Sequence, residues 1–124
     1  MTPSRNIFCV EDDGNLADLL KTQLNVMGYN ACGFADNAQA AIAGIEKSNP
    51  DLVLVDIELR GKQEGFEIGN YLNSKTDIPF IYVTGHDDKK ILAQARQTIP
   101  DGFLLKPFDM RQLKVAIEMA NRID

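Results

Sequence analysis

Short hydrophobic runs recur along this chain, and the four strongest of them each end in a polar residue. They cover residues 7–10, 52–55, 80–83 and 103–105. Apolar runs of this length, bounded by turn signals, are typical of strands buried on both faces of a parallel sheet. A weaker run over residues 29–34 contains Asn30 and Gly33, and it predicts a fifth strand at an edge of the sheet.

Between these runs, apolar residues recur with the spacing of helices. Gly28 provides a C-terminal stop for the first predicted helix, and Asp36 or Asn37 can cap the start of the second. The third helix follows a polar, glycine-rich loop over residues 60–65, and the last runs from about 109 to 121. On these four helices the positions expected to face the core are Leu16, Leu19, Leu20, Leu24 and Met27; Ala38, Ala41, Ile42 and Ile45; Phe66, Gly69 and Leu72; and Leu113, Ala116, Ile117 and Ala120.

The predicted fourth helix, about residues 87–98, differs from the others because most of it is polar. Only Ile91, Leu92 and Ala95 can anchor it to a core. Few buried anchors mean a low local stability, so we expect a loosely held helix.

Strands that alternate with helices predict an α/β fold, a doubly wound five-stranded parallel sheet with helices on both faces. Because crossovers between parallel strands are right-handed, few strand orders are possible. With the weak second strand at one edge and the fifth at the other, we expect the order 2-1-3-4-5. The chain of 124 residues is expected to form a single domain over 1–124, since it has no internal linker or repeat.

The polar residues that follow the strands are expected to meet in space. Glu11 and Asp12 follow the first strand, Asp56 the third, Thr84 the fourth and Lys106 the fifth. Ligands of such sheets gather at the carboxyl ends of the strands, beside the point where the strand order reverses. Three carboxylates, a hydroxyl and an ammonium at one place suit a divalent metal ion and a phosphoryl group.

The residue types indicate which role each side chain could have in binding a metal ion and a phosphoryl group. Crowded carboxylates raise each other's pKa, and a hard cation such as Mg²⁺ relieves their repulsion. Asp56 is the candidate nucleophile, because a carboxylate can accept a phosphoryl group as an acyl phosphate; the alternative is a metal ligand without covalent chemistry. Lys106 can neutralise phosphate charge, and a cis bond to Pro107 can aim it inward. Thr84 can donate to a phosphoryl oxygen, whereas Asp13 is expected to be only a solvated loop residue or a helix cap.

Composition argues against several other classes of protein. The net charge is −5 and no basic patch stands out, which disfavours direct binding of nucleic acid. No apolar stretch approaches the roughly 20 residues of a membrane-spanning helix. The polar N-terminus lacks a secretory signal, so we expect a cytoplasmic location. Cys9 and Cys32 are expected to be reduced core residues, and His86 lacks a partner for a zinc site.

Four motifs of the chain together resemble the receiver domain of two-component response regulators, of the chemotaxis-regulator kind. They read VEDD at residues 10–13, DLVLVDI at 51–57, PFIYVTG at 79–85 and GFLLKPF at 102–108. The resemblance spans about residues 6–122 and implies the flavodoxin-like receiver fold of five βα repeats. It also implies that a sensor histidine kinase, or a phosphotransfer domain, passes a phosphoryl group from a phosphohistidine to Asp56.

The same resemblance implies a role for each site residue. Mg²⁺ or Mn²⁺ is held by Glu11, Asp12, Asp56 and the backbone carbonyl of Glu58, while Lys106 pairs with the phosphate, Thr84 is the switch hydroxyl and Phe103 the switch aromatic. Such a domain is a phosphoacceptor with its own Mg²⁺-dependent self-phosphorylation and dephosphorylation, rather than an enzyme with an external substrate.

The partner surface is expected on the fourth helix, the fifth strand and the fifth helix. Val115 and Met119 lie outside the buried stripe of the last helix, which favours an exposed face there. This face would serve a downstream protein target, a fused output domain or a homodimer. A stand-alone regulator and a receiver excised from a longer chain both remain open, and no membrane contact is expected.

Departures from the family pattern occur at four positions. Arg60 stands where a proline is common, so the shape of its loop is not carried over from the family. Phe103 lacks the hydroxyl of the more usual tyrosine. Glu58 and His86, two residues beyond Asp56 and Thr84, occupy positions that influence how fast the acyl phosphate is lost.

Two alternative functions remain. A haloacid-dehalogenase-like phosphatase combines similar residues, but it resembles Asp-x-Asp at its nucleophile where this chain has Asp56-Ile57-Glu58. That family also places acidic ligands after its lysine, and the acidic residues available there are Asp109, Glu118 and Asp124. The other alternative is a receiver that binds its partners without being phosphorylated.

Overall fold

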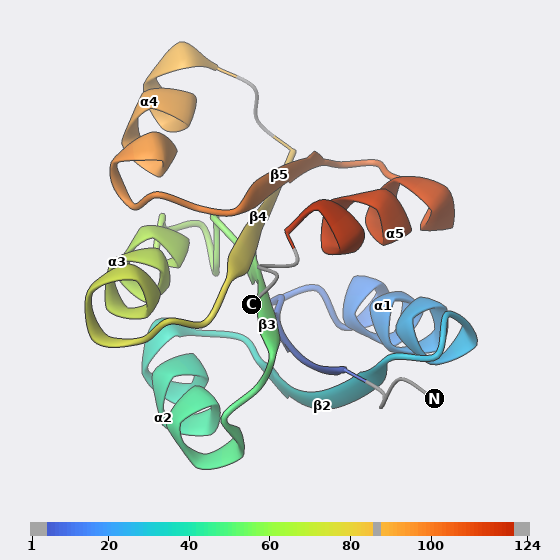
Figure 1. Ribbon diagram of the computed structural model, residues 1–124. Helices are drawn as coiled ribbons and strands as arrows, with labels where there is room; N and C mark the ends of the chain where they lie inside the picture. Colours follow the sequence, from blue (N-terminus) through green and yellow to red (C-terminus); the bar gives the residue numbers. More distant parts are fainter. Residues whose placement is uncertain (1–4, 86–87, 121–124) are drawn as a thin grey trace.

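The computed structural model describes residues 5–85 and 88–120 of the chain. Within these residues, five strands alternate with five helices along the sequence (Figure 1). The elements are β1 (Asn6–Val10), α1 (Gly14–Val26), β2 (Asn30–Ala35), α2 (Ala38–Ser48), β3 (Leu52–Asp56), α3 (Gly65–Lys75), β4 (Phe80–Thr84), α4 (Lys89–Gln97), β5 (Gly102–Leu105) and α5 (Met110–Met119).

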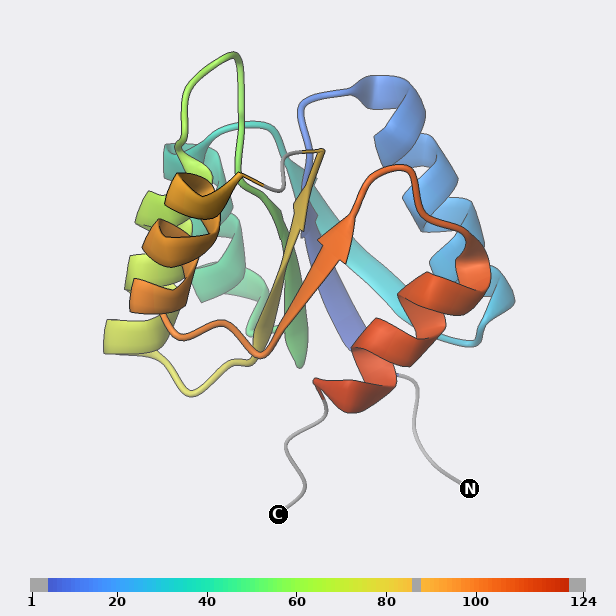
Figure 2. The ribbon, with the colours of Figure 1, turned by 90° about the horizontal axis from the view of Figure 1, so that it is seen from above.

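The strands form one parallel sheet in the order β2-β1-β3-β4-β5, which confirms the predicted topology. Seen along the sheet, α1 and α5 cover one face, and α2, α3 and α4 cover the other (Figure 2). The sheet is therefore buried between two layers of helices, as the doubly wound fold requires.

Two hydrophobic cores flank the sheet, and alternate residues of each strand feed them. On β3, Val53 and Val55 belong to the core under α2, α3 and α4, whereas Leu52 and Leu54 belong to the core under α1 and α5. Successive side chains of a strand point to opposite faces, so a strand with both faces covered must be apolar throughout. This requirement is the reason for the uninterrupted hydrophobic runs.

The edge strand β2 is only half buried, as its mixed composition predicts. Its register with β1 shifts between Ile7 and Phe8, which leaves Cys32 as an extra residue. Cys9 is fully buried in β1, where burial raises the pKa of its thiol, and both cysteines are free. The prediction that they are core residues is thus confirmed for Cys9, while Cys32 is half buried.

Local capping explains where the helices begin and end. Asp13 accepts the backbone N–H groups of Asn15 and Leu16 at the start of α1, which confirms its role as a cap. Asn37, rather than Asp36, caps α2 through the N–H of Ala40. Further along, Asp109 and Gln112 form a reciprocal capping box at α5. Gly28, with a φ of 88°, follows the end of α1 as predicted.

Some boundaries and buried positions differ from the expectation. Helix α4 begins at Lys89 because Asp88 caps it, while Asp87 and Asn121, expected at the ends of α4 and α5, lie outside the described residues. Leu19 is 49% exposed, since it faces a surface hollow instead of the core. The other apolar positions that are half buried instead of buried are Leu16, Met27, Ile42, Leu92 and Ala116.

The C-terminal end of α4 is tied to the sheet, which the sequence did not indicate. The hydroxyl of Tyr82, on β4, lies 2.5 Å from Thr98 Oγ1, and Thr98 donates to the carbonyl oxygen of Ala95 at 2.7 Å. Burial raises the pKa of Tyr82 to about 12, so the hydroxyl keeps its proton. This buried pair fastens one end of the helix that was expected to be loosely held.

The close approach of α3 to this hydrogen bond predicts the effect of one substitution. A Cβ at position 69 would overlap the Tyr82 hydroxyl and lie 3.2 Å from Thr98 Oγ1. We expect Gly69→Ala to lower the free energy of unfolding by about 1–3 kcal/mol through overpacking. Gly14→Ala is the matched control, because a Cβ there meets no atom within 4 Å. Equal urea midpoints for the two variants would show that the packing around Tyr82 is loose.

Candidate functional site

Three acidic residues converge at the carboxyl edge of the sheet. Glu11 and Asp12 follow β1, and Asp56 is the last residue of the neighbouring strand β3. Each offers one carboxylate oxygen, and these oxygens all lie within 4.8 Å of one another. The structure therefore brings together the carboxylates that the strand order predicts.

Lys106, after β5, reaches across to these carboxylates. Its Nζ atom lies 2.8 Å from Asp56 Oδ2 and 3.1 Å from Glu11 Oε1. Its backbone N–H donates to the carbonyl oxygen of Thr84 at 2.8 Å, and the bond to Pro107 is cis. An ammonium group is thus placed against the predicted nucleophile.

Backbone N–H groups hold three further carboxylate oxygens. The N–H of Asp13 donates to Glu11 Oε2 at 3.1 Å, and the N–H of Glu58 donates to Asp56 Oδ1 at 3.1 Å. A third bond, from the N–H of Arg60, reaches Asp12 Oδ2 at 2.7 Å. Hydrogen bonds from fixed backbone groups orient these charges before any ligand arrives.

An open pocket of about 310 Å³ contains this cluster. Its lining residues are Glu11, Asp12, Asp13, Asp56, Glu58, Gly61, Thr84, Gly85 and Lys106. Glu11 and Asp56 are buried at its base, while Asp12 is exposed. Hard oxygen donors with open space beside them fit Mg²⁺, which keeps several waters and also binds phosphate oxygens.

The pKa values reflect the crowding of these charges. Burial, together with the charge of Asp56, raises the pKa of Glu11 to about 7, although Asp13 and Lys106 oppose the shift. Burial lowers the pKa of Lys106, but its hydrogen bonds and charge interactions with Asp56 and Glu11 outweigh this, so the pKa is raised overall. The Lys106 ammonium therefore stays charged at neutral pH. The Glu11 carboxyl, with a pKa of about 7, is only partly ionised at that pH.

The predicted switch residues lie on the α4 side of the site. Thr84 is buried and lies two residues after Tyr82 on β4, hence on the same face of that strand. Phe103 is half buried, and its ring packs edge to face on the ring of Tyr82, with 6.1 Å between the ring centroids. His86 lies outside the described residues.

Sequence reasoning missed part of the pocket. Gly61 and Gly85 line it without a polar side chain, and Arg60 contacts Asp12 through its backbone N–H rather than its side chain. The glycine-rich loop after Asp56 was the available signal for Gly61. A backbone N–H aimed at a carboxylate can be recognised only once the turn geometry is known.

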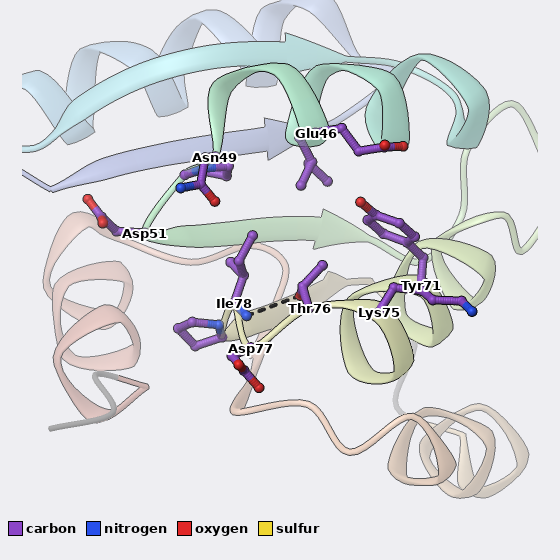
Figure 3. Close-up of a pocket in the computed structure, with 11 residues that line it drawn as sticks. Glu46, Asn49, Asp51, Tyr71, Lys75, Thr76, Asp77 and Ile78 are labelled. Atoms are coloured by element: carbon purple, nitrogen blue, oxygen red, sulfur yellow. Dashed lines mark hydrogen bonds between the residues drawn. The ribbon is translucent and has the colours of Figure 1, made fainter. Parts of the chain in front are cut away.

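A second surface groove, of about 500 Å³, lies at the opposite edge of the sheet (Figure 3). It runs between the ends of α2 and α3, and Tyr71, Thr76 and Ile78 are among its lining residues. The carboxylate and ammonium groups labelled there do not point to one centre (Figure 3). It offers no counterpart to the cluster around Asp56.

Comparison with known proteins assigns the family. The sequence profile of the response regulator receiver domain matches residues 7–118. The chain belongs to this family. It is a receiver domain of two-component response regulators, a class of phosphoacceptor signalling domains. The resemblance deduced from the four motifs is confirmed.

Relatives and solved structures agree with this assignment. The chain is 31% identical over 117 residues to the transcriptional regulatory protein KdpE of Staphylococcus aureus, covering 94% of this chain and 50% of that protein. It is 28% identical to the transcriptional regulatory protein PdtaR of Mycobacterium tuberculosis, over 94% of this chain and 56% of that protein. The receiver domain of a modulated diguanylate cyclase from Desulfovibrio desulfuricans superposes with a TM-score of 0.85, at 35% identity, covering 94% of this chain and 93% of that one.

The chain spans about half the length of the curated relatives it matches. Among the described residues, no helix is both long enough and apolar enough to cross a membrane. Family membership argues against the phosphatase alternative, and so does the placement of Asp109 and Glu118. Asp109 caps α5, Glu118 lies exposed on α5, and Asp124 is outside the described residues.

The raised pKa of Glu11 predicts how stability depends on pH in the metal-free protein. The folded state binds the Glu11 proton more tightly than the unfolded chain does, so stability falls as pH rises from about 4.5 to about 7. Over this pH range we expect the wild type to lose on the order of 2 kcal/mol of its free energy of unfolding through Glu11, and Glu11→Gln not to show this loss. Urea unfolding in chelator at pH 5 and pH 8 measures the difference.

Added Mg²⁺ serves as the control, because a cation that binds beside Glu11 stabilises the wild type more than Glu11→Gln and should reduce or reverse the difference between the two proteins at pH 8. Parallel pH profiles of wild type and Glu11→Gln in chelator would contradict the prediction.

Proposed function

We propose that Asp56 accepts a phosphoryl group from the phosphohistidine of a sensor histidine kinase or a phosphotransfer domain. A carboxylate oxygen of Asp56 bonds to phosphorus while the bond from phosphorus to the histidine nitrogen breaks, and the electron pair stays on the imidazole. The observation that carries the proposal is the buried Asp56 carboxylate, 2.8 Å from the Lys106 ammonium and among two further carboxylates.

A divalent cation, Mg²⁺ or Mn²⁺, would be held by Glu11, Asp12, Asp56 and the backbone carbonyl of Glu58. The cation would neutralise charge on the phosphoryl oxygens. The acidic cluster supports this ligand set, because its carboxylate oxygens lie within 4.8 Å of one another and Glu58 lines the same pocket.

Lys106 and Thr84 would complete the site. With Asp56 converted to an acyl phosphate, the Lys106 ammonium is close enough to pair with a phosphoryl oxygen. Thr84 lines the same pocket, and its hydroxyl can donate to another oxygen of the group. Charge neutralisation and positioning are what phosphoryl transfer requires of the protein.

The switch follows from new charge at the carboxyl edge of the sheet. An acyl phosphate adds about −1.5 to −2 charges, and only groups that contact it differently can shift the conformational equilibrium. Thr84 and Lys106 are such groups. Phe103 packs on Tyr82, two residues before Thr84, so a shift of Thr84 can reach β5 and α4 through this contact.

The α4–β5–α5 face is the proposed output surface. Four large apolar side chains on β5 and α5 are exposed, Leu105, Met110, Val115 and Met119, the last by 80%. Exposed apolar groups of this kind favour contact with a protein. The partner would be a downstream target, a fused output domain or a second copy in a homodimer.

The phosphoryl donor would approach on the other side of the site. An apolar hollow of about 430 Å³ adjoins Lys106, and the remaining residues that line it are Asp13, Leu16, Leu19, Pro107 and Phe108. Any protein that delivers a phosphoryl group to Asp56 must contact this neighbourhood. Such a contact would cover the exposed side chain of Leu19.

As a whole, we propose one receiver domain over residues 1–124 that works in the cytoplasm as a phosphoacceptor and has no external substrate. The curated relatives are about twice as long and are named as transcriptional regulators, which supports an output domain in some proteins of this kind. Both a fused and a stand-alone arrangement are compatible with the receiver itself.

Phosphorylation tests the proposal directly. With labelled acetyl phosphate and Mg²⁺, we expect acid-stable, base-labile label on the wild type and at least tenfold less on Asp56→Asn. Asp51→Asn is the matched control, since Asp51 is an exposed aspartate outside the site that accepts the N–H of Asn6. A wild type that takes no label in the presence of a cognate kinase would favour the receiver that acts without phosphorylation.

A further inference from the structure

The loop between β3 and α3 contains a tight turn rather than an irregular segment. Leu59 and Lys62 exchange backbone hydrogen bonds of 2.7 and 3.0 Å, and the two residues between them have φ values of 55° at Arg60 and 75° at Gly61. Positive φ at both central residues is the geometry of a two-residue hairpin turn of type I′. Residues 60–62 of the loop predicted over 60–65 therefore belong to a defined turn.

This turn is tied to the connections that follow β1 and β2. The N–H of Arg60 donates to Asp12 Oδ2 at 2.7 Å, and its guanidinium pairs with Asp36 Oδ2 at 2.8 Å. Further along the loop, Glu64 Oε1 accepts the N–H of Ala38 at 2.9 Å. Figure 2 shows the loop rising beside the β1–α1 connection, above the same edge of the sheet.

The ties made by Arg60 differ in strength. The guanidinium and Asp36 are both at least half exposed, and an exposed ion pair contributes little to stability. A short hydrogen bond from a backbone N–H to a carboxylate is stronger and has a fixed direction. The backbone of Arg60, more than its side chain, therefore determines how the Asp12 carboxylate is held.

We infer that Arg60 is a positioning residue for the cation site, because its backbone N–H orients the Asp12 carboxylate in that site. The inference rests on the cation site of the proposed function, though not on phosphoryl transfer. The residue can do this only with the positive φ that it has here, since the turn aims its N–H at β1.

A proline at this position could not act in the same way. Proline has no N–H, and its ring fixes φ near −65°, whereas φ is 55° at Arg60. The family pattern that places proline here therefore does not describe this chain. Arg60 supplies a donor to a carboxylate of the site.

Linkage makes the effect reciprocal. If the closed turn favours the geometry of Asp12 that binds a cation, a bound cation must favour the closed turn to the same extent. Hydrogen bonds to metal-binding carboxylates can have a large effect, because their loss typically lowers metal affinity 10- to 100-fold.

Two substitutions of Arg60 separate the backbone donor from the side chain. Arg60→Pro removes the N–H, whereas Arg60→Asn keeps it, tolerates positive φ and removes only the guanidinium. Mg²⁺ titrations followed by amide chemical shifts require no phosphorylation. We expect the Kd for Mg²⁺ to rise about tenfold in Arg60→Pro and to stay within twofold of wild type in Arg60→Asn.

Hydrogen exchange of the Arg60 amide in the wild type tests the same inference without a variant. We expect slower exchange than for an unprotected amide, and further slowing when Mg²⁺ is added. This measurement decides the matter if Arg60→Pro fails to fold.

Equal weakening in both variants would overturn the inference, because the guanidinium would then be responsible. Wild-type affinity in Arg60→Pro, or an unprotected Arg60 amide, would overturn it as well. A wild type that binds no Mg²⁺ would remove the cation site itself, and with it the proposed function. The two failures are thus distinguishable.

Discussion

Repulsion among carboxylates at one edge of the sheet is the constraint on which the rest of this structure depends. Glu11, Asp12 and Asp56 are brought within 4.8 Å of one another by the strand order, and two of them are buried. One ammonium, from Lys106, and three backbone N–H groups oppose the repulsion. They leave a net negative pocket, in which the pKa of Glu11 is raised. A cation would relieve this repulsion, and the proposed phosphoryl group would then find positive charge beside it.

The scaffold explains how the fold tolerates such a crowded polar site. Both faces of the sheet are packed, so each central strand presents polar groups only where it ends. The same packing links the site to the surface, because Thr84 shares a strand with Tyr82, whose ring contacts Phe103 and whose hydroxyl contacts Thr98 at the end of α4. A charge added at Asp56, in the pocket that Thr84 also lines, can therefore act on the proposed output face through Tyr82, Phe103 and Thr98.

Family membership and individual geometry answer different questions about this chain. The motifs by which the chain resembles the family contain the acidic cluster, the lysine and the hydroxyl. It does not account for the turn at Arg60 and Gly61, whose positive φ values place a backbone N–H on Asp12. A loop that departs from the family pattern thus supplies a hydrogen-bond donor to Asp12, a carboxylate of the proposed cation site.

From the sequence alone one could obtain the fold class, the strand order and the five polar residues of the site, because the hydrophobic runs mark buried strands and a parallel sheet collects their ends at one edge. Other features required the tertiary structure. The exposure of Leu19, the hydrogen bond from Tyr82 to Thr98 and the N–H of Arg60 on Asp12 all join segments distant in sequence. Periodicity reports which face of an element is apolar, but not what the neighbouring element leaves uncovered. Backbone donors carry no signature in residue type, so only the folded turn reveals them.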